Sequence, residues 1–146
     1  MKKLIWLLFL GILYSCDEKM PTPTPNELID ADIAFSDYSL KNGLQKAFIE
    51  FADDSVVLLK VNRMPIIGKT ELIKSYEGKS DSGMILTWKP AKAIPASSGE
   101  LGYTYGFWMF VAQNDTTKGT YLTVWKKDGN GHWKYIADTG NEGLKK

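Results

Sequence analysis

The chain has 146 residues, with 18 basic and 17 acidic side chains and a formal net charge of +1. This balance offers no basic stripe to neutralise phosphates and argues against a nucleic-acid-binding protein. With one cysteine and one histidine, the sequence favours neither an internal disulfide nor a metal site. We also expect no cofactor, because no glycine-rich phosphate loop, nucleophile elbow or paired-carboxylate motif occurs.

The N-terminus has the pattern of an export signal. Lys2 and Lys3 precede an apolar run that is too short to cross a bilayer, which takes roughly 20 apolar residues. The run ends at the only cysteine, and the last four residues, Leu13-Tyr14-Ser15-Cys16, resemble the lipobox of bacterial lipoproteins, although Tyr14 is bulkier than usual there. A buried N-terminal helix and an ordinary secretory signal are the alternatives.

The lipobox resemblance implies a signal peptide over residues 1–15 and a diacylglycerol on the thiol of Cys16, followed by acylation of the new amine. Removing the first 15 of 146 residues leaves 131, and the loss of two lysines changes the net charge from +1 to −1. We expect the mature protein to be anchored by lipid to the inner or outer membrane of a bacterial envelope, with its domain in the periplasm or at the surface.

Alternating prolines in residues 16–25 predict a semi-rigid polyproline tether. Thr24-Pro25-Asn26-Glu27 then has the capping residue, the proline and the glutamate that start a helix. Asn42-Gly43 interrupts the helical spacing of apolar residues, so we expect one helix to end near Lys41 and a second to cover about 44–52.

Strand patterns dominate the rest of the chain. We expect a strand over 55–61, a short edge strand over 64–67 because of Pro65, and a third helix over 69–77 with Leu72, Ile73 and Tyr76 inward. Turn-forming residues then separate four strands, at 84–96, 100–113, 118–127 and 132–138, and residues 141–146 are expected to fray. Helices followed by an antiparallel meander predict an α+β fold.

Several of these stretches resemble the SnoaL-like domains of the nuclear transport factor 2-like superfamily, over residues 26–140. The resemblance rests on Ala52-Asp53-Asp54, on Gly68 before the third helix, and on the segments Gly102-Tyr103-Thr104-Tyr105-Gly106, Gly119 to Lys127 and Gly131-His132-Trp133-Lys134. It implies a cone-shaped, curved antiparallel sheet wrapped around the N-terminal helices, with a pocket inside. Because this superfamily includes isomerases, dehydratases, hydrolases and binding domains, the fold alone does not assign an activity.

Ketosteroid isomerase is the sharpest test of an enzymatic role, and its chemistry is a worked example of pKa tuning. The resemblance places the isomerase base at Leu59 and the helical tyrosine donor at Phe35 or Ser36. None of these side chains can do that chemistry, so we do not expect isomerase activity of this type.

The remaining acid–base candidate is Asp138, which we expect to point inward at the mouth of the cone because it shares a strand face with Ile136. The alternative is that Asp138 caps the last turn or pairs with a lysine. His132, in a turn beside Gly131, is expected to be exposed, as are the strand-end charges of Lys126 and Lys127.

Aromatic residues are the other candidate site feature. The expected ligand pocket is formed by Trp88, Tyr103, Tyr105, Trp108, Tyr121 and Trp125. Core packing is an alternative role for all six. Gly102 and Gly106, which share one face of a strand, would permit strong sheet curvature or close approach of a helix.

Two functions stay open at this point. The favoured one is a lipid-anchored module that binds a small apolar molecule or a protein partner without catalysis, in many relatives as a homodimer through the outer sheet face. The other is an envelope enzyme acting on a small organic substrate, with Asp138 as base and Tyr103, Tyr105 or Tyr121 as hydrogen-bond donors.

Overall fold

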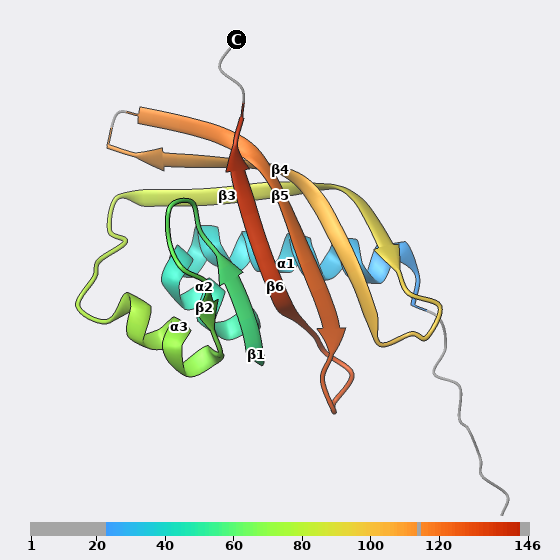
Figure 1. Ribbon diagram of the computed structural model, residues 1–146. Helices are drawn as coiled ribbons and strands as arrows, with labels where there is room; N and C mark the ends of the chain where they lie inside the picture. The colour runs from blue at the N-terminus through green and yellow to red at the C-terminus, as the bar shows by residue number, and fades with distance from the viewer. Residues whose placement is uncertain (1–22, 114, 144–146) are drawn as a thin grey trace, which may run out of the picture.

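The computed structural model describes residues 23–113 and 115–143, so the predicted signal peptide, Cys16 and most of the predicted tether lie outside the described residues. Three helices and six strands make up this part of the chain (Figure 1). In chain order they are α1 (Pro25–Asn42), α2 (Leu44–Phe51), β1 (Ala52–Leu59), β2 (Ile66–Ile67), α3 (Lys69–Tyr76), β3 (Met84–Pro95), β4 (Leu101–Ala112), β5 (Asp115–Lys127) and β6 (Trp133–Glu142). No helix among these residues is long and apolar enough to cross a membrane.

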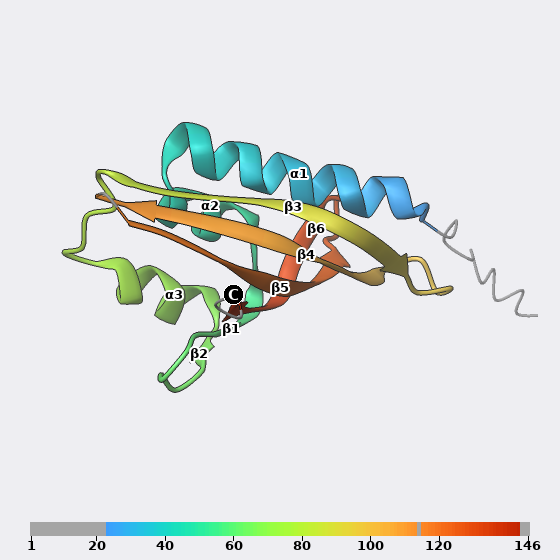
Figure 2. The ribbon, with the colours of Figure 1, turned by 90° about the horizontal axis from the view of Figure 1, so that it is seen from above.

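The six strands form one curved, unclosed sheet in the order β2-β1-β6-β5-β4-β3. Four of the neighbouring pairs are antiparallel, and β1 pairs with β6 in parallel. Seen from above, α1 and α2 lie along one side of this sheet, while α3 lies near β1 and β2 (Figure 2). The predicted α+β fold, a curved sheet wrapped around N-terminal helices, is confirmed.

The sequence signals that bound α1 act as expected. Thr24 caps the helix, since its hydroxyl accepts a bond from the Glu27 backbone and the Glu27 carboxylate accepts one from the Thr24 backbone. At the other end Gly43 has φ 95°, a conformation that glycine adopts without steric cost, and α2 begins directly after it. The predicted break between two helices is confirmed.

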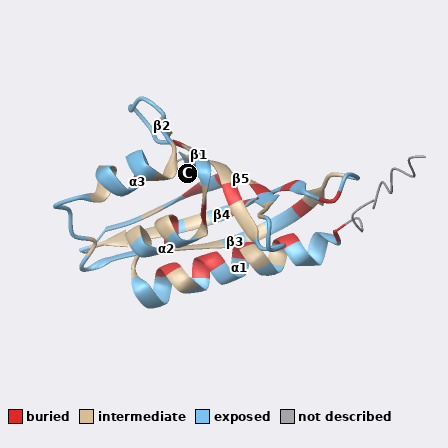
Figure 3. Ribbon diagram, turned by 90° about the horizontal axis from the view of Figure 1, so that it is seen from below, coloured by how far each residue is buried: buried red, intermediate tan, exposed pale blue. Residues whose placement is uncertain are grey.

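Helix α1 covers the edge strand β3. Its buried side chains lie on one face, coloured red in Figure 3. Two serines on this face bond to the β3 backbone: Ser36 Oγ accepts from the Trp88 amide at 2.9 Å, and Ser39 Oγ donates to the Leu86 carbonyl at 2.9 Å. These bonds satisfy groups that an edge strand would otherwise leave unpaired.

Helix α1 also approaches β4 closely. A Cβ at Gly102 would lie 2.5 Å from Leu28 Cδ1, so only glycine allows this approach. At Gly106 a Cβ would lie 2.1 Å from the Lys89 carbonyl oxygen, near the register shift between Pro90 and Lys92. The two glycines therefore serve helix approach and sheet curvature respectively.

An aromatic cluster fills one half of the space between the helices and the sheet. Phe35 stacks on Tyr135 with ring centroids 5.3 Å apart and meets Phe48 edge-on at 5.0 Å. Trp125 and Tyr135 are fully buried, and their polar atoms are paired: Trp125 Nε1 donates to Thr104 Oγ1 at 2.9 Å, and the Tyr135 hydroxyl donates to the Phe48 carbonyl at 2.8 Å. Of the six aromatic residues predicted to form the pocket, Trp125 therefore has the alternative role, core packing.

Some predicted boundaries were wrong. Strand β1 begins at Ala52 rather than Ser55, because Ala52 already pairs with Tyr135 ahead of an irregular register. Strand β6 continues to Glu142, since Asn141 and Glu142 pair with Thr120 and Gly119, so these two residues do not belong to a frayed tail.

One predicted core side chain also differs from expectation. In α3, Leu72 is buried but Ile73 is 41% exposed, because the short helix turns only one face to the sheet.

Candidate functional site

A cavity of about 320 Å³ lies beside the aromatic cluster, where β1 and β6 end and β5 begins. Its lining is mainly apolar and aromatic, with a few polar groups and one carboxyl. The lining residues are Phe35, Phe48, Leu58, Leu59, Lys60, Val61, Leu86, Trp88, Trp108, Phe110, Thr117, Tyr121, Thr123, Asp138 and Gly140. The structure thus brings four of the predicted site residues to one cavity, namely Trp88, Trp108, Tyr121 and Asp138.

Asp138 reaches this cavity by a route that the sequence did not show. Tyr135 pairs with Trp125 while Ala137 pairs with Val124, so Ile136 lies at a bulge in β6. The bulge shifts the alternation of side chains by one, and both Tyr135 and Asp138 therefore face the interior. The predicted inward direction of Asp138 agrees with the structure.

The Asp138 carboxyl is held by a single hydroxyl. Thr123 Oγ1 donates to Asp138 Oδ2 at 2.6 Å, and no hydrogen bond to Oδ1 occurs among the described residues. Burial raises the pKa of Asp138 to about 6, with a further upward contribution from Asp32; the Thr123 hydrogen bond and the charge of Lys60 oppose it. Asp138 can therefore exchange a proton near neutral pH.

A second carboxyl, Asp32 on α1, lies behind the cavity wall. It is fully buried and accepts from Tyr121 at 2.6 Å through Oδ2 and from Trp88 Nε1 at 2.7 Å through Oδ1. Burial raises the pKa of Asp32, against hydrogen bonds from Tyr121, Thr104 and Trp88. Burial and this carboxylate likewise raise the pKa of Tyr121, so its hydroxyl stays protonated.

Asp32 is not among the residues predicted from the sequence, although its spacing carries a signal. The buried positions of α1 include Leu28, Asp32 and Phe35, so an acidic residue occupies the apolar face of an amphipathic helix. Such a residue needs buried partners. Nothing in the sequence identified those partners as Trp88 and Tyr121.

The outer wall of the cavity depends on close packing of Trp108. Its Nε1 donates to the Thr120 carbonyl at 3.0 Å, and its ring lies over two glycines. A Cβ at Gly119 would lie 2.4 Å from Trp108 Cζ2, and one at Gly140 would lie 3.2 Å from Trp108 Nε1. Small residues on β5 and β6 therefore make room for this indole.

Lys60 provides the cation at the mouth. It follows β1, is exposed, and its Nζ lies 4.8 Å from the centroid of the Tyr76 ring. Partial burial lowers the pKa of Lys60, and the positive charges of Arg63 and Lys79 lower it further.

Three of the six predicted pocket residues lie elsewhere. Tyr103 and Tyr105 are 38% and 42% exposed on the outer face of β4, because side chains alternate along a strand and Gly102, Thr104, Gly106 and Trp108 occupy the inner face. The prediction that they supply hydroxyls to the pocket was therefore wrong. Trp125 faces inward but belongs to the aromatic cluster and does not line the cavity.

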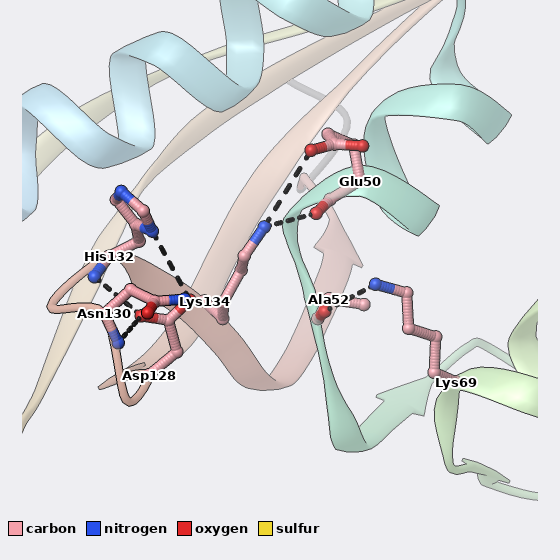
Figure 4. A network of polar contacts seen from close by, with 7 residues as sticks. All are labelled: Glu50, Ala52, Lys69, Asp128, Asn130, His132 and Lys134. Carbon is pink, nitrogen blue, oxygen red and sulfur yellow. Dashed lines mark hydrogen bonds and ion pairs between the residues drawn. The ribbon is translucent and has the colours of Figure 1, made fainter.

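A network of polar contacts lies away from the cavity, near the start of β1 and the turn between β5 and β6 (Figure 4). His132 is 73% exposed there, as expected, with its Nδ1 3.5 Å from Asp128 Oδ2; Asp128 Oδ1 accepts from the backbone amides of Asn130 and His132. Lys134 donates to the Glu50 carbonyl at 2.7 Å, and Lys69 donates to the Ala52 carbonyl at 3.2 Å.

Lys127 also differs from the expected solvated charge. Its side chain is 16% exposed, lies 3.2 Å from Glu27 and covers the Trp133 ring.

Within residues 23–113 and 115–143, no group of three or more histidine, cysteine or acidic side chains is arranged to hold a metal ion.

The positions that the isomerase resemblance assigned to catalysis do line the cavity. Leu59 and Phe35 both contribute to its wall, and Ser36 is buried beside it with its hydroxyl committed to the Trp88 amide. The chain thus has apolar side chains where that chemistry needs a base and a phenol.

No protein-family model and no curated protein matches this sequence significantly. Solved structures do match over most of the chain. A nuclear transport factor 2-like protein of unknown function from Shewanella oneidensis MR-1 gives a TM-score of 0.64 at 14% identity, covering 79% of this chain and 96% of that one. A putative ketosteroid isomerase from Parabacteroides distasonis gives 0.64 at 18% identity, covering 85% and 95%.

A third structure, a domain of unknown function with a cystatin-like fold from Nostoc punctiforme, gives a TM-score of 0.65 at 14% identity, covering 84% of this chain and 81% of that one. Identities this low establish shape and leave activity open. The helices, the curved open sheet and these neighbours agree: the chain has the nuclear transport factor 2-like, cystatin-like fold.

Proposed function

We propose that this protein is a lipid-anchored component of a bacterial envelope whose SnoaL-like domain binds a small apolar molecule without catalysis. The observation that carries the ligand-binding role is the cavity of about 320 Å³, whose walls are mainly aromatic and aliphatic. Its volume lies in the range of small-molecule sites, and its few polar groups suit orientation of a ligand.

A cavity-filling variant tests the binding role. Thr117 lines the rim, so Thr117→Trp should fill the space and abolish uptake of apolar molecules. The neighbouring Thr116→Trp is the matched control, because Thr116 is exposed and does not line the cavity. Native mass spectrometry of the domain purified from its own envelope should show a bound molecule in wild type and in the control only. Equal loading of both variants would contradict a ligand site in this cavity.

The anchoring role rests on the N-terminal sequence. Cys16→Ala should move the protein from the membrane fraction to the soluble fraction, and mass spectrometry should find acyl chains on the mature N-terminal cysteine of wild type. Continued membrane association of the variant, or an unmodified cysteine in wild type, would contradict a lipid anchor.

An enzymatic role has one specific observation in its favour, the cavity carboxyl of Asp138 with its pKa near 6. Against it, the Tyr121 hydroxyl donates to Asp32, and Tyr103 and Tyr105 lie on the opposite face of the sheet. Loss of about a hundredfold or more in turnover of any apolar substrate in Asp138→Asn would favour the enzyme.

The outer sheet face supports a protein contact. Apolar side chains are exposed together on the outer face of β4 and β5, where Leu122 pairs with Tyr105. They are Tyr103, Tyr105, Phe107, Met109 and Leu122. We propose that this face forms a homodimer. Phe107, 65% exposed, is the test position: Phe107→Glu should convert a dimer to a monomer in sedimentation analysis, whereas a monomeric wild type would refute the dimer.

A further inference from the structure

The polar hydrogens of the cavity wall are already used inside the protein. The Tyr121 hydroxyl donates a hydrogen bond to Asp32, and the Thr123 hydroxyl donates one to Asp138. The two indoles of the wall are committed as well, Trp88 Nε1 to Asp32 and Trp108 Nε1 to the Thr120 carbonyl. What these side chains still offer a ligand is oxygen lone pairs and aromatic faces.

The remaining donors lie at the margin. Lys60 is exposed at the mouth, and the Thr117 hydroxyl, which can both donate and accept, is at the start of β5. Deeper in the cavity, Asp138 Oδ1 has no hydrogen-bonding partner among the described residues. A ligand that enters with its polar group inward therefore meets acceptors.

The titratable groups in and directly behind the inner cavity wall are carboxyls, so any charge there is negative. Asp138 lines the cavity, Asp32 lies directly behind Trp88 and Tyr121, and neither carboxyl forms an ion pair within the described residues. A buried carboxylate without a cation is unfavourable, and a positive ligand would offset that cost. The aromatic faces of Trp88, Trp108 and Phe110 also favour a cation over a neutral or anionic group.

From the committed hydroxyls, the unpaired Asp138 oxygen and the aromatic walls, we propose that the cavity selects an organic cation: a primary amine with an apolar body whose ammonium group binds Asp138. This inference rests on the proposed ligand-binding function and specifies its ligand class.

Three probes of matched shape test the selection: 4-phenylbutylamine, 4-phenylbutan-1-ol and 4-phenylbutanoate. By isothermal titration calorimetry at about pH 8, the amine should bind at least about tenfold more tightly than the alcohol, as expected for a hydrogen bond to a charged group. The butanoate, which would place a carboxylate beside Asp138, should bind most weakly. If the alcohol or the butanoate binds as tightly as the amine, the cation inference fails while the ligand-binding function stands. If none of the three binds, the proposed function fails with it.

Two variants assign the effect to named groups. Asp138→Asn should abolish the preference for the amine while leaving affinity for the alcohol within about twofold. Lys60→Gln removes the competing cation at the mouth of the cavity and should raise the affinity for the amine only. Lys46→Gln is its control, because Lys46 is an exposed lysine on α2 away from the cavity. An unchanged amine preference in Asp138→Asn would overturn the assignment, even if Lys60→Gln behaved as expected.

The preference should also depend on pH. The charged or titratable groups around Asp138 are Asp32 from α1, Lys60 after β1, Tyr76 from α3, Tyr121 from β5 and Tyr135 from β6. The three tyrosines have pKa values raised above their usual range, so they stay neutral. Lowering the pH from about 8 to about 5 should therefore weaken amine binding by protonating Asp138, without affecting the alcohol. Amine affinity that is constant across this range would contradict a carboxylate partner.

Discussion

The two halves of β5 face the same interior but meet different surroundings. Toward Lys127, Trp125 packs with Phe35 and Tyr135 in a cluster of buried rings. Toward Asp115, Thr117, Tyr121 and Thr123 line a cavity that also contains Asp138. In Figure 1 the end of β4, the start of β5 and the end of β6 lie above the helices. One strand thus builds a stabilising core at one end and leaves a ligand-sized space at the other.

Replacing one tryptophan in each half should show the largest difference in stability between the two halves. Trp125→Ala deletes a fully buried indole and leaves Thr104 without its partner, so it should lower the free energy of unfolding by about 3–5 kcal/mol. Trp108→Ala, in the cavity wall, should cost about 1–2 kcal/mol, because that indole is already partly exposed. Urea denaturation followed by circular dichroism measures both, and equal losses would contradict the division into a filled and a hollow half.

Asp32 joins the halves, and its removal should be nearly as costly. Asp32→Ala leaves the Tyr121 hydroxyl and the Trp88 indole without their acceptor, so we expect a loss of about 3 kcal/mol. Asp32→Asn keeps one acceptor oxygen and should cost about half as much. A loss below about 1 kcal/mol in Asp32→Ala, by the same denaturation assay, would mean that water or a rearranged side chain replaces the carboxylate.

Alternation along β4 shows how much of this arrangement was accessible from sequence. The period of two that puts Gly102 and Gly106 on one face of β4 puts Trp108 on that face too, and puts Tyr103 and Tyr105 on the opposite face. The two tyrosines and Trp108 could therefore not all line one pocket, and their joint assignment conflicted with the pattern itself. The helix break at Gly43 and the Thr24 cap were predictable because each is a local signal.

Long-range features were not predictable in the same way. The bulge at Ile136 reverses the alternation of β6, and one extra residue in a strand leaves no local mark in composition. The bonds from Trp88 and Tyr121 to Asp32 join residues 56 and 89 positions apart, and only the fold selects such partners.

Alanine substitutions of glycines should affect stability differently in the two halves, because the atoms around the added Cβ can move aside more easily in the hollow half. A Cβ at Gly102 meets Leu28 Cδ1 at 2.5 Å and the Ile94 carbonyl oxygen at 3.0 Å within the filled half, so Gly102→Ala should cost about 2 kcal/mol. At Gly140 the nearest atom is Trp108 Nε1 at 3.2 Å, and the indole can shift toward the cavity. Gly140→Ala should change stability by less than about 0.5 kcal/mol, since a stiffer unfolded chain offsets slight crowding. Thermal melts that rank the two variants in the opposite order would contradict this account.

The last expected change has the opposite sign, because the hollow half keeps a carboxyl at a cost to stability. The pKa of Asp138 is about 6 in the folded protein against 3.8 as a reference, so the folded state binds the proton more tightly than the unfolded state. Stability from this group is complete below about pH 4 and is lost as the pH rises through 6. Asp138→Asn, which can still accept from Thr123, should therefore stabilise the domain by about 1–2 kcal/mol at about pH 8 and leave it unchanged at about pH 4. The Thr116→Asn variant, at an exposed position of β5, controls for a general effect of introducing an amide. If Asp138→Asn instead destabilised the domain by the same amount at both pH values, Asp138 would be a structural residue. Its carboxylate would then not be available to bind a ligand in the cavity.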